Sequence, residues 1–169
     1  MDAIEAILSR RSIRKYTNDP LPDLVVNEIL RAAMSAPSAG NEQPWHFVVI
    51  RDRETLDRIP EVHPHAQMIK EAQVAVLICG DLGLEKHKGF WVQDCSAATE
   101  NLLLAARAKG LGAVWLGIYP REDRVEGLRR MLEIPEGVIP FALVPLGHPA
   151  EKKPKEDRFN ADRIHLERW

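Results

Sequence analysis

Four residues near the N-terminus, Arg10, Arg11, Ser12 and Arg14, form a cluster that could bind an anion. Guanidinium groups beside a hydroxyl can hold a phosphate through several charge-assisted hydrogen bonds. The cluster also follows a short segment with helical apolar spacing, and positive charge at the C-terminus of a helix is favourable in itself. From this cluster alone, a phosphate site and a solvated basic patch are both open interpretations.

A loop over residues 36–47 carries a second group of polar side chains. Ser38, Asn41 and Gln43 supply hydrogen-bond donors and acceptors of the kind that read the edge of a heterocycle, and Pro37 restricts the backbone beside them. By itself, such a loop could be only a turn that ends the preceding helix. One helical segment separates the two clusters. Together they indicate a ligand with a phosphate at one end and a flat polar ring at the other.

Other kinds of site find little support in the chain. The GxSxG, Walker A and HExxH motifs are absent, and the glycines that follow the apolar run 74–79 lack the GxGxxG spacing. His63 and His65 are two residues apart in a proline-broken segment without a third ligand nearby, so we interpret them as surface histidines and predict no metal site. Cys79 and Cys95 each lie in an apolar pattern, which is typical of reduced, buried thiols.

Length and composition describe an ordinary globular protein. The 169 residues fit a single domain, with 45% hydrophobic and 28% charged residues and a formal net charge of -2. Nucleic-acid-binding proteins are more often basic, so we expect no nucleic-acid partner. The N-terminus has no basic segment before an apolar core, and no apolar run is long enough to cross a bilayer. We therefore expect a cytoplasmic protein that does not bind membranes.

Periodicity predicts a sheet covered by helices, in an α+β or α/β arrangement. The predicted helices and strands follow one another along the chain, with helices over 2–9, 23–35, 54–58, 94–109 and 122–132 and strands over 45–50, 74–79, 113–118 and 140–146.

Three segments lead to expectations beyond the core. The helix over 94–109 is apolar almost all the way round, so we infer a homodimer that covers it. The tail over 148–169 ends on apolar residues, and we expect it to pack against the body or a partner. The loop over 80–91 is long enough to act as a lid, in which Phe90 and Trp91 would gate a pocket; packing in the core is the alternative for both side chains.

Four stretches resemble, in the same order, the FMN-dependent nitroreductase family: Arg10–Tyr16, Ala36–Trp45, Gly110–Gly117 and Pro145–Lys152. The resemblance extends over essentially the whole chain. It implies an α+β fold with a central, mostly antiparallel sheet flanked by helices. It also implies an intertwined homodimer with FMN bound in two sites at the subunit interface.

The resemblance also implies roles for particular residues. The FMN phosphate and ribityl chain would be held by Arg10, Arg11, Ser12 and Arg14. The loop that approaches the flavin from the partner subunit would contribute Pro37, Ser38, Ala39 and Asn41. The strand end along the isoalloxazine would be Leu116 and Gly117, with a backbone N–H suited to reach flavin N5. A basic residue of the tail would complete the phosphate site, and we choose Arg158 over Lys153 and Lys155.

The chain departs from the family pattern in two places. His65 and Met68 occupy the positions where many members have an asparagine and a lysine that contact the flavin. The longer helical excursion of larger members is missing, which leaves the loop over 84–91 as the only evident cover.

The implied reaction is flavin-borne, and no side chain is predicted to act as an acid or base. NADH or NADPH would deliver a hydride to flavin N5, and a nitroaromatic, quinone or activated alkene would then take the electrons. Two alternatives stay open. One is a non-catalytic FMN-binding carrier or sensor, and the other is a flavin-transforming or dehalogenating relative.

Overall fold

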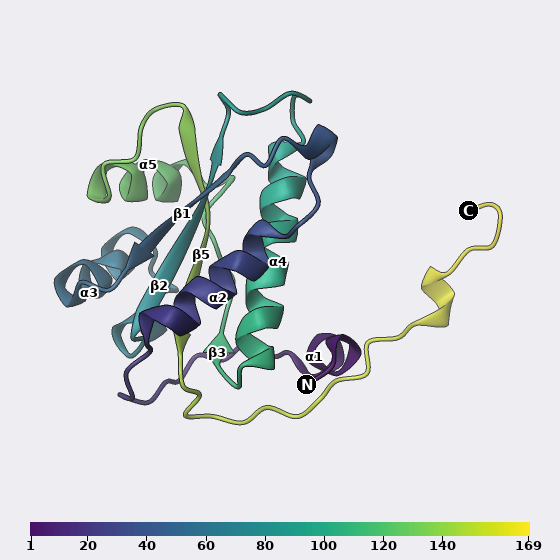
Figure 1. Ribbon diagram of the computed structural model, residues 1–169, viewed down its shortest axis with the longest axis horizontal. Coiled ribbons are helices and arrows are strands. Elements are labelled where there is room, and N and C mark those ends of the chain that lie inside the picture. The colour runs from purple at the N-terminus through teal and green to yellow at the C-terminus, as the bar shows by residue number, and fades with distance from the viewer.

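A five-stranded sheet forms the centre of the computed structural model, which describes residues 1–169 (Figure 1). The strands are β1 (Trp45–Ile50), β2 (Val74–Asp81), β3 (Gly112–Ala113), β4 (Leu116–Gly117) and β5 (Val138–Gly147). They are arranged in the order β1-β2-β5-β3, with β4 also paired to β5, and every pair of strands is antiparallel. The predicted α+β fold with a mostly antiparallel sheet is confirmed.

The two central strands are buried on both faces, as their nearly continuous apolar sequences predict. Alternate side chains of a strand point to opposite faces of the sheet. In β2, Val76 and Ile78 therefore belong to one hydrophobic cluster, whereas Leu77 and Cys79 belong to the other.

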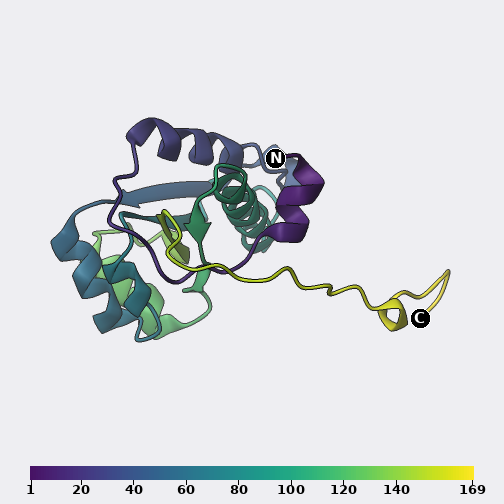
Figure 2. The ribbon, with the colours of Figure 1, turned by 90° about the horizontal axis from the view of Figure 1, so that it is seen from below.

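Helices cover both of these faces. They are α1 (Ala3–Ser9), α2 (Asp23–Met34), α3 (Arg53–Val62), α4 (Trp91–Ala108) and α5 (Glu122–Met131). Side chains of α2 and α4 join the first cluster, and those of α3 and α5 join the second. Helix α1 lies beside the C-terminal end of α4 (Figures 1 and 2). No helix combines the length and the apolar character that a bilayer span would need.

Two predicted elements differ from the observed ones. Helix α3 continues to Val62, beyond the predicted segment 54–58, and contains Pro60. The predicted strand over 113–118 is divided into β3 and β4, although both keep one register with β5: Gly112 lies opposite Gly147 and Gly117 lies opposite Ala142. The ladder is thus interrupted between the two short strands without a shift in register.

The C-terminal tail leaves the body of the chain. Its first residues run beside the basic cluster, and the remainder extends past α1 into open space (Figures 1 and 2). Leu166 is 83% exposed and Trp169 is 101% exposed. Within one chain the end of the tail is therefore exposed, and its packing against a partner stays a prediction.

Candidate functional site

The first basic cluster opens into a cavity of about 350 Å³ between α1, the end of α4 and the start of the tail. Its walls include apolar side chains from α4 and the segment that follows, among them Leu103 and Leu111. The only carboxylate in the lining is Glu151. The cationic residues of the lining are Arg10, Arg11, Arg107, Lys152 and Lys153. Such an excess of positive charge suits an anionic ligand.

Backbone contacts fix the basic cluster against the sheet. Helix α1 ends at Ser9, and the chain that follows is extended, so that Ser12 forms a parallel bridge with Ala113 and the amide of Ile13 donates to the Ala113 carbonyl at 2.9 Å. A side chain at Gly112 would put a Cβ 2.7 Å from the Cγ2 of Ile13. Glycine at this position therefore permits the close approach of the two segments.

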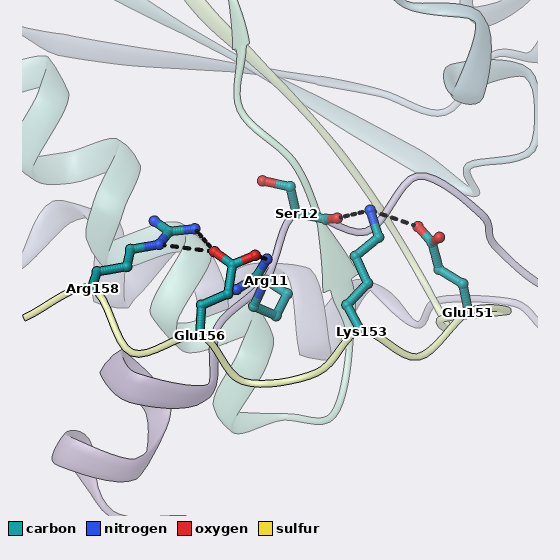
Figure 3. A network of polar contacts seen from close by, with 6 residues as sticks. All are labelled: Arg11, Ser12, Glu151, Lys153, Glu156 and Arg158. Atoms are coloured by element: carbon teal, nitrogen blue, oxygen red, sulfur yellow. Dashed lines mark hydrogen bonds and ion pairs between the residues drawn. The ribbon is translucent and has the colours of Figure 1, made fainter.

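Lys153 joins this cluster, as Figure 3 shows. Its Nζ donates to the carbonyl of Ser12 at 2.8 Å and lies 3.5 Å from a carboxylate oxygen of Glu151. Its side chain is only 28% exposed. Lys153 is thus held at the wall of the cavity by the extended segment that carries Ser12.

Arg158 lies elsewhere, at the outer end of a second set of contacts (Figure 3). Its guanidinium donates to Glu156 at 2.9 Å, and Glu156 in turn accepts from Arg11 at 2.5 Å. The hydrogen bond from Arg11, followed by that from Arg158, lowers the pKa of Glu156 to about 2. The Arg158 side chain is 70% exposed and does not line the cavity. Lys153 is thus the tail residue that lines this cavity, whereas Arg158 lines an adjoining hollow of about 410 Å³ with Arg10 and Arg11. The choice of Arg158 for the phosphate stays a prediction.

The other predicted members of the cluster play different parts. The carbonyl of Ser12 is taken by Lys153, and the side chain of Arg14 is exposed while its amide donates to Glu151. Arg107 was not predicted, yet it lines the cavity and donates to the hydroxyl of Ser9 at 2.9 Å. An arginine in the last turn of α4, directly after the apolar run 102–106, was the available signal for it.

The second predicted cluster folds into a tight loop around the short helix η1 (Ala39–Asn41). Positive φ angles occur at Gly40, Asn41 and Gln43. The hydroxyl of Ser38 accepts from the Gln43 amide at 3.0 Å, and the Gln43 side chain donates to Asn41 at 2.9 Å. Exposed side chains of the loop include those of Pro37 and Asn41. The loop therefore presents its polar groups outward.

The two clusters lie at opposite ends of α4 (Figure 1). The amide of Ala39 donates to Asp94 in the first turn of α4 at 3.0 Å, whereas Arg107 in its last turn lines the basic cavity. Asp94 and Arg107 are about 20 Å apart, at about 1.5 Å of helix rise per residue. Within one chain, the two clusters are too far apart to surround the same part of one small ligand.

The strand end predicted to lie along the flavin, Leu116 and Gly117, is supported by side chains that were not identified from the sequence. Nη1 of Arg124 donates to the carbonyl of Gly117 at 2.8 Å and lies 3.2 Å from Nε2 of His63. His63 is 3% exposed, so the prediction of a surface histidine is wrong for this residue. Burial, followed by the charge of Arg124, lowers the pKa of His63. Because arginine can only donate, Nε2 accepts and the neutral ring carries its proton on Nδ1.

We expect an Arg124→Gln substitution to lower the free energy of unfolding by about 1 to 2 kcal/mol, because the Gly117 carbonyl and His63 both lose a charged donor. Urea denaturation measures this change. The matched control is Arg121→Gln, since Arg121 pairs only with Asp123 at the surface and its loss should change stability by less than about 0.5 kcal/mol. Equal effects of the two substitutions would contradict the supporting role of Arg124.

Phe90 and Trp91 have different environments. Phe90 is 48% exposed at the end of the loop that precedes α4, so it is free to cover a pocket. Trp91 is 7% exposed, and its ring packs edge-on against those of Tyr119 and Phe141 at centroid distances of 4.9 and 5.9 Å. A Cβ at Gly80 would lie 2.3 Å from the Trp91 ring. The position of Trp91 is that of a core residue, whereas the lid interpretation stays open for Phe90.

The two positions that depart from the family pattern, His65 and Met68, lie between α3 and β2. His65 is exposed. Met68 is partly buried and packs against the hydrophobic cluster to which α3 and α5 contribute. Neither lines the basic cavity.

Comparison with known proteins identifies the family. A model described as "Nitroreductase family" matches residues 7–89 and 61–148. A protein of Methanothermobacter thermautotrophicus, provisionally named NADH dehydrogenase/NAD(P)H nitroreductase, is 59% identical over 100% of this chain and 88% of its own length.

Solved structures agree with this comparison. The crystal structure of a protein from Parabacteroides distasonis with the same provisional name is 40% identical, with a TM-score of 0.95 and coverage of 99% of this chain and 98% of that chain. A provisionally named nitroreductase of Desulfovibrio desulfuricans, solved in complex with FMN, is 32% identical, with a TM-score of 0.86. The match covers 100% of this chain and 98% of that chain. The resemblance seen in the four sequence stretches is thus confirmed, and the chain belongs to the nitroreductase family.

Proposed function

We propose that this chain is an FMN-dependent oxidoreductase that uses NADH or NADPH to reduce a small oxidised acceptor. The observation that carries the proposal is the cavity beside the first basic cluster, where five cationic side chains face a single carboxylate. The relative from D. desulfuricans, which covers the whole of this chain, was solved with FMN. The relative from M. thermautotrophicus carries NAD(P)H in its name.

The donor set of the cavity fits the phosphate end of FMN. Arg10, Arg11 and Lys153 offer charged N–H groups, and guanidinium and ammonium groups both bind phosphate strongly. Apolar side chains such as Leu103 and Leu111 line the rest of the cavity and can pack against the less polar part of the cofactor. We assign these residues to the cofactor, with Lys153 as the tail residue among them.

FMN, when bound, supplies the redox chemistry by accepting a hydride from NAD(P)H and passing electrons to the acceptor. The chain's own residues bind and orient. The basic cluster would hold the phosphate of FMN, and the Gly117 segment, held by Arg124, would offer its backbone to the flavin ring. Phe90 is half-exposed and lines a hollow with Pro37 and Ser38, and we assign to it the exclusion of water from above the loop. Nitroaromatics, quinones and activated alkenes are the acceptor classes we propose.

We further propose that the active unit is a homodimer. The loop with Pro37, Ser38 and Asn41 lies at the opposite end of α4 from the basic cavity of its own chain. A second copy placed in antiparallel fashion along α4 would bring this loop beside the partner's cavity. The exposed apolar residues of α1 and of the tail support such an association.

Anaerobic mixing of the FMN-loaded protein with NADH or NADPH tests the proposed reaction. We expect one of the two nucleotides to bleach the visible absorbance of the flavin within a single turnover, and subsequent addition of a quinone or nitroaromatic to restore it. Absence of bleaching with both nucleotides would overturn the reductase proposal in favour of an FMN carrier or sensor. Bleaching that is followed by a modified flavin, or by release of halide from a halogenated substrate, would favour the other alternative.

A further inference from the structure

Two carboxyl groups, those of Glu42 and Asp94, are buried together at the N-terminal end of α4. They are 6% and 4% exposed. One oxygen of each group is well satisfied: Oε2 of Glu42 accepts from the amides of Lys86 at 2.7 Å and His87 at 2.9 Å, and Oδ1 of Asp94 accepts from the amide of Ala39 at 3.0 Å. Three separate segments of the chain meet at this pair.

The remaining oxygens, Oε1 of Glu42 and Oδ2 of Asp94, are buried without a hydrogen-bond partner. An ionised carboxylate can only accept, so two charged groups could not satisfy one another and would also repel. The side chains are nevertheless within hydrogen-bonding reach of each other. One proton between them would turn one of the unsatisfied oxygens into a donor for the other and leave a single negative charge.

The environment distinguishes the two groups. Burial raises the pKa of Asp94 above its ordinary value, and the neighbouring Glu42 acts in the same direction. Burial opposes the ionisation of Glu42 as well, but the amides of His87 and Lys86 outweigh it and lower the pKa of Glu42. The charge therefore belongs on Glu42 and the proton on Asp94.

We propose that Glu42 and Asp94 share one proton, and that this protonated pair positions the loop over 37–43 for its contact with the flavin. The flavin contact rests on the function proposed above, whereas the shared proton does not. Both side chains are buried beneath the loop rather than exposed on it. Both are positioning residues, which act through the loop that they hold.

The contacts around the pair explain how it holds the loop. Asp94 fixes the backbone directly after Ser38, through the amide of Ala39. Glu42 ties the end of the same loop to the segment before α4, where the His87 ring packs so closely on Gly40 that a Cβ there would lie 2.5 Å from Nε2. Gly40 has a φ of 53°, so both its conformation and its contact favour glycine.

The sign of the pH dependence follows from these assignments. Between the lowered pKa of Glu42 and the raised pKa of Asp94, the pair holds one proton. As the pH rises through the upper value, the proton leaves and two buried negative charges repel, which loosens the loop. The other charged groups that act on the pair are Glu85, which favours the proton on Asp94, and His87, which favours the charge on Glu42.

Infrared spectroscopy of the protein without FMN tests the shared proton. At neutral pH the wild-type chain is expected to show the C=O stretching band of a protonated carboxylic acid. The band should be absent from both Asp94→Asn and Glu42→Gln, because an amide replaces the proton with a permanent donor in each variant. A wild-type spectrum without the band, or a band that persists in both variants, would overturn the proposal.

Titration with FMN at increasing pH tests the positioning role. Above the upper pKa of the pair, the dissociation constant of the wild-type chain should rise by up to about tenfold per pH unit, because the competent fraction falls by that factor. Asp94→Asn should bind FMN as tightly as the wild type at neutral pH, and its dissociation constant should not rise in this way at higher pH. Asp94→Ala, which removes the acceptor for the Ala39 amide, should bind more weakly at every pH.

The matched variants separate this titration from others. The titration of the FMN phosphate is the same in experiments with the wild type and with Asp94→Asn, so its contribution cancels in the comparison. His87→Gln removes the neighbouring imidazole and should retain the rise. Parallel pH profiles for the wild type and Asp94→Asn would overturn the positioning role. A wild-type chain that bound no FMN at any pH would overturn the proposed function and the positioning role with it, while the infrared band would still decide whether the proton is shared.

Discussion

A variant that replaces both Arg10 and Lys153 with alanine is expected to bind FMN about a hundredfold more weakly than the wild-type chain. Each residue offers a charged donor to the same cavity. Loss of one hydrogen bond to a charged group costs about 1.5 to 3 kcal/mol, and about 1.4 kcal/mol corresponds to a factor of ten in affinity. Two such losses would give a factor of about a hundred at the lower end. Because the residues share one anion, the two effects need not be additive.

Quenching of flavin fluorescence during titration of the protein without cofactor measures this loss. Riboflavin, which lacks the phosphate, is the matched ligand: the double variant and the wild type should bind it equally well. The matched protein control is Arg158→Ala, because Arg158 is 70% exposed and pairs with Glu156 outside the cavity. Its substitution should change the FMN dissociation constant by less than about threefold. A larger effect of Arg158→Ala than of Lys153→Ala would favour the assignment made from the sequence.

The fold was predictable wherever apolar periodicity was strong. Strand β1 has the predicted bounds. Strands β2 and β5 contain the predicted segments, because their burial on both faces demands nearly continuous apolar sequence. The division of the predicted strand over 113–118 was not predictable in this way. Its residues are apolar throughout, and pairing with β5 lapses only between Ala113 and Leu116. Backbone pairing, which leaves no mark on composition, decides that boundary.

The path of the tail limited what could be predicted of the site. Lys153, Lys155 and Arg158 are similar in sequence context, and only the direction of the chain beyond Pro149 determines which of them meets Ser12. The sequence could narrow the choice to these basic residues but could not decide among them.

Supporting contacts were hidden for a related reason. His63 and Arg124 lie 61 residues apart in the chain, and Glu42 meets the amide of His87 at a separation of 45 residues. Other polar or charged residues lie close to each of them in the sequence, so no local spacing indicates its partner. The stretches that resemble the family were visible because their residues are adjacent. The residues that hold those stretches in place became visible only in three dimensions.

A variant with glutamate at two positions of α1, Ile4→Glu with Leu8→Glu, is expected to be monomeric and to lose FMN while its own basic cavity and loop remain intact. Ile4 is 65% exposed and Leu8 is 64% exposed, although α1 has only seven residues. Other residues of α1, Ala3, Ala6 and Ile7, line a mostly apolar hollow of about 530 Å³ between α1, α2 and α4, whereas Leu8 lines a second hollow that also contains Arg10 and Arg11. A patch of this kind on a surface helix is typical of an interface. Burial of each side chain would contribute about 1.5 to 3 kcal/mol, and a symmetric dimer buries four, so their loss should weaken association by at least about ten thousandfold.

Sedimentation analysis and FMN titration of the same samples test both parts of this expectation. Leu82→Glu is the matched control, since Leu82 is 43% exposed in the loop after β2, away from α1, and its substitution should leave the dimer and its FMN unchanged. The polar loop lies at one end of α4 and the basic cavity at the other, so in the proposed dimer a single chain would hold only half of each cofactor's surroundings, which links the two readouts. A monomer that kept wild-type affinity for FMN would contradict that arrangement, because one chain would then supply the complete site. A variant that remained dimeric would instead show that the apolar face of α1 lies outside the interface.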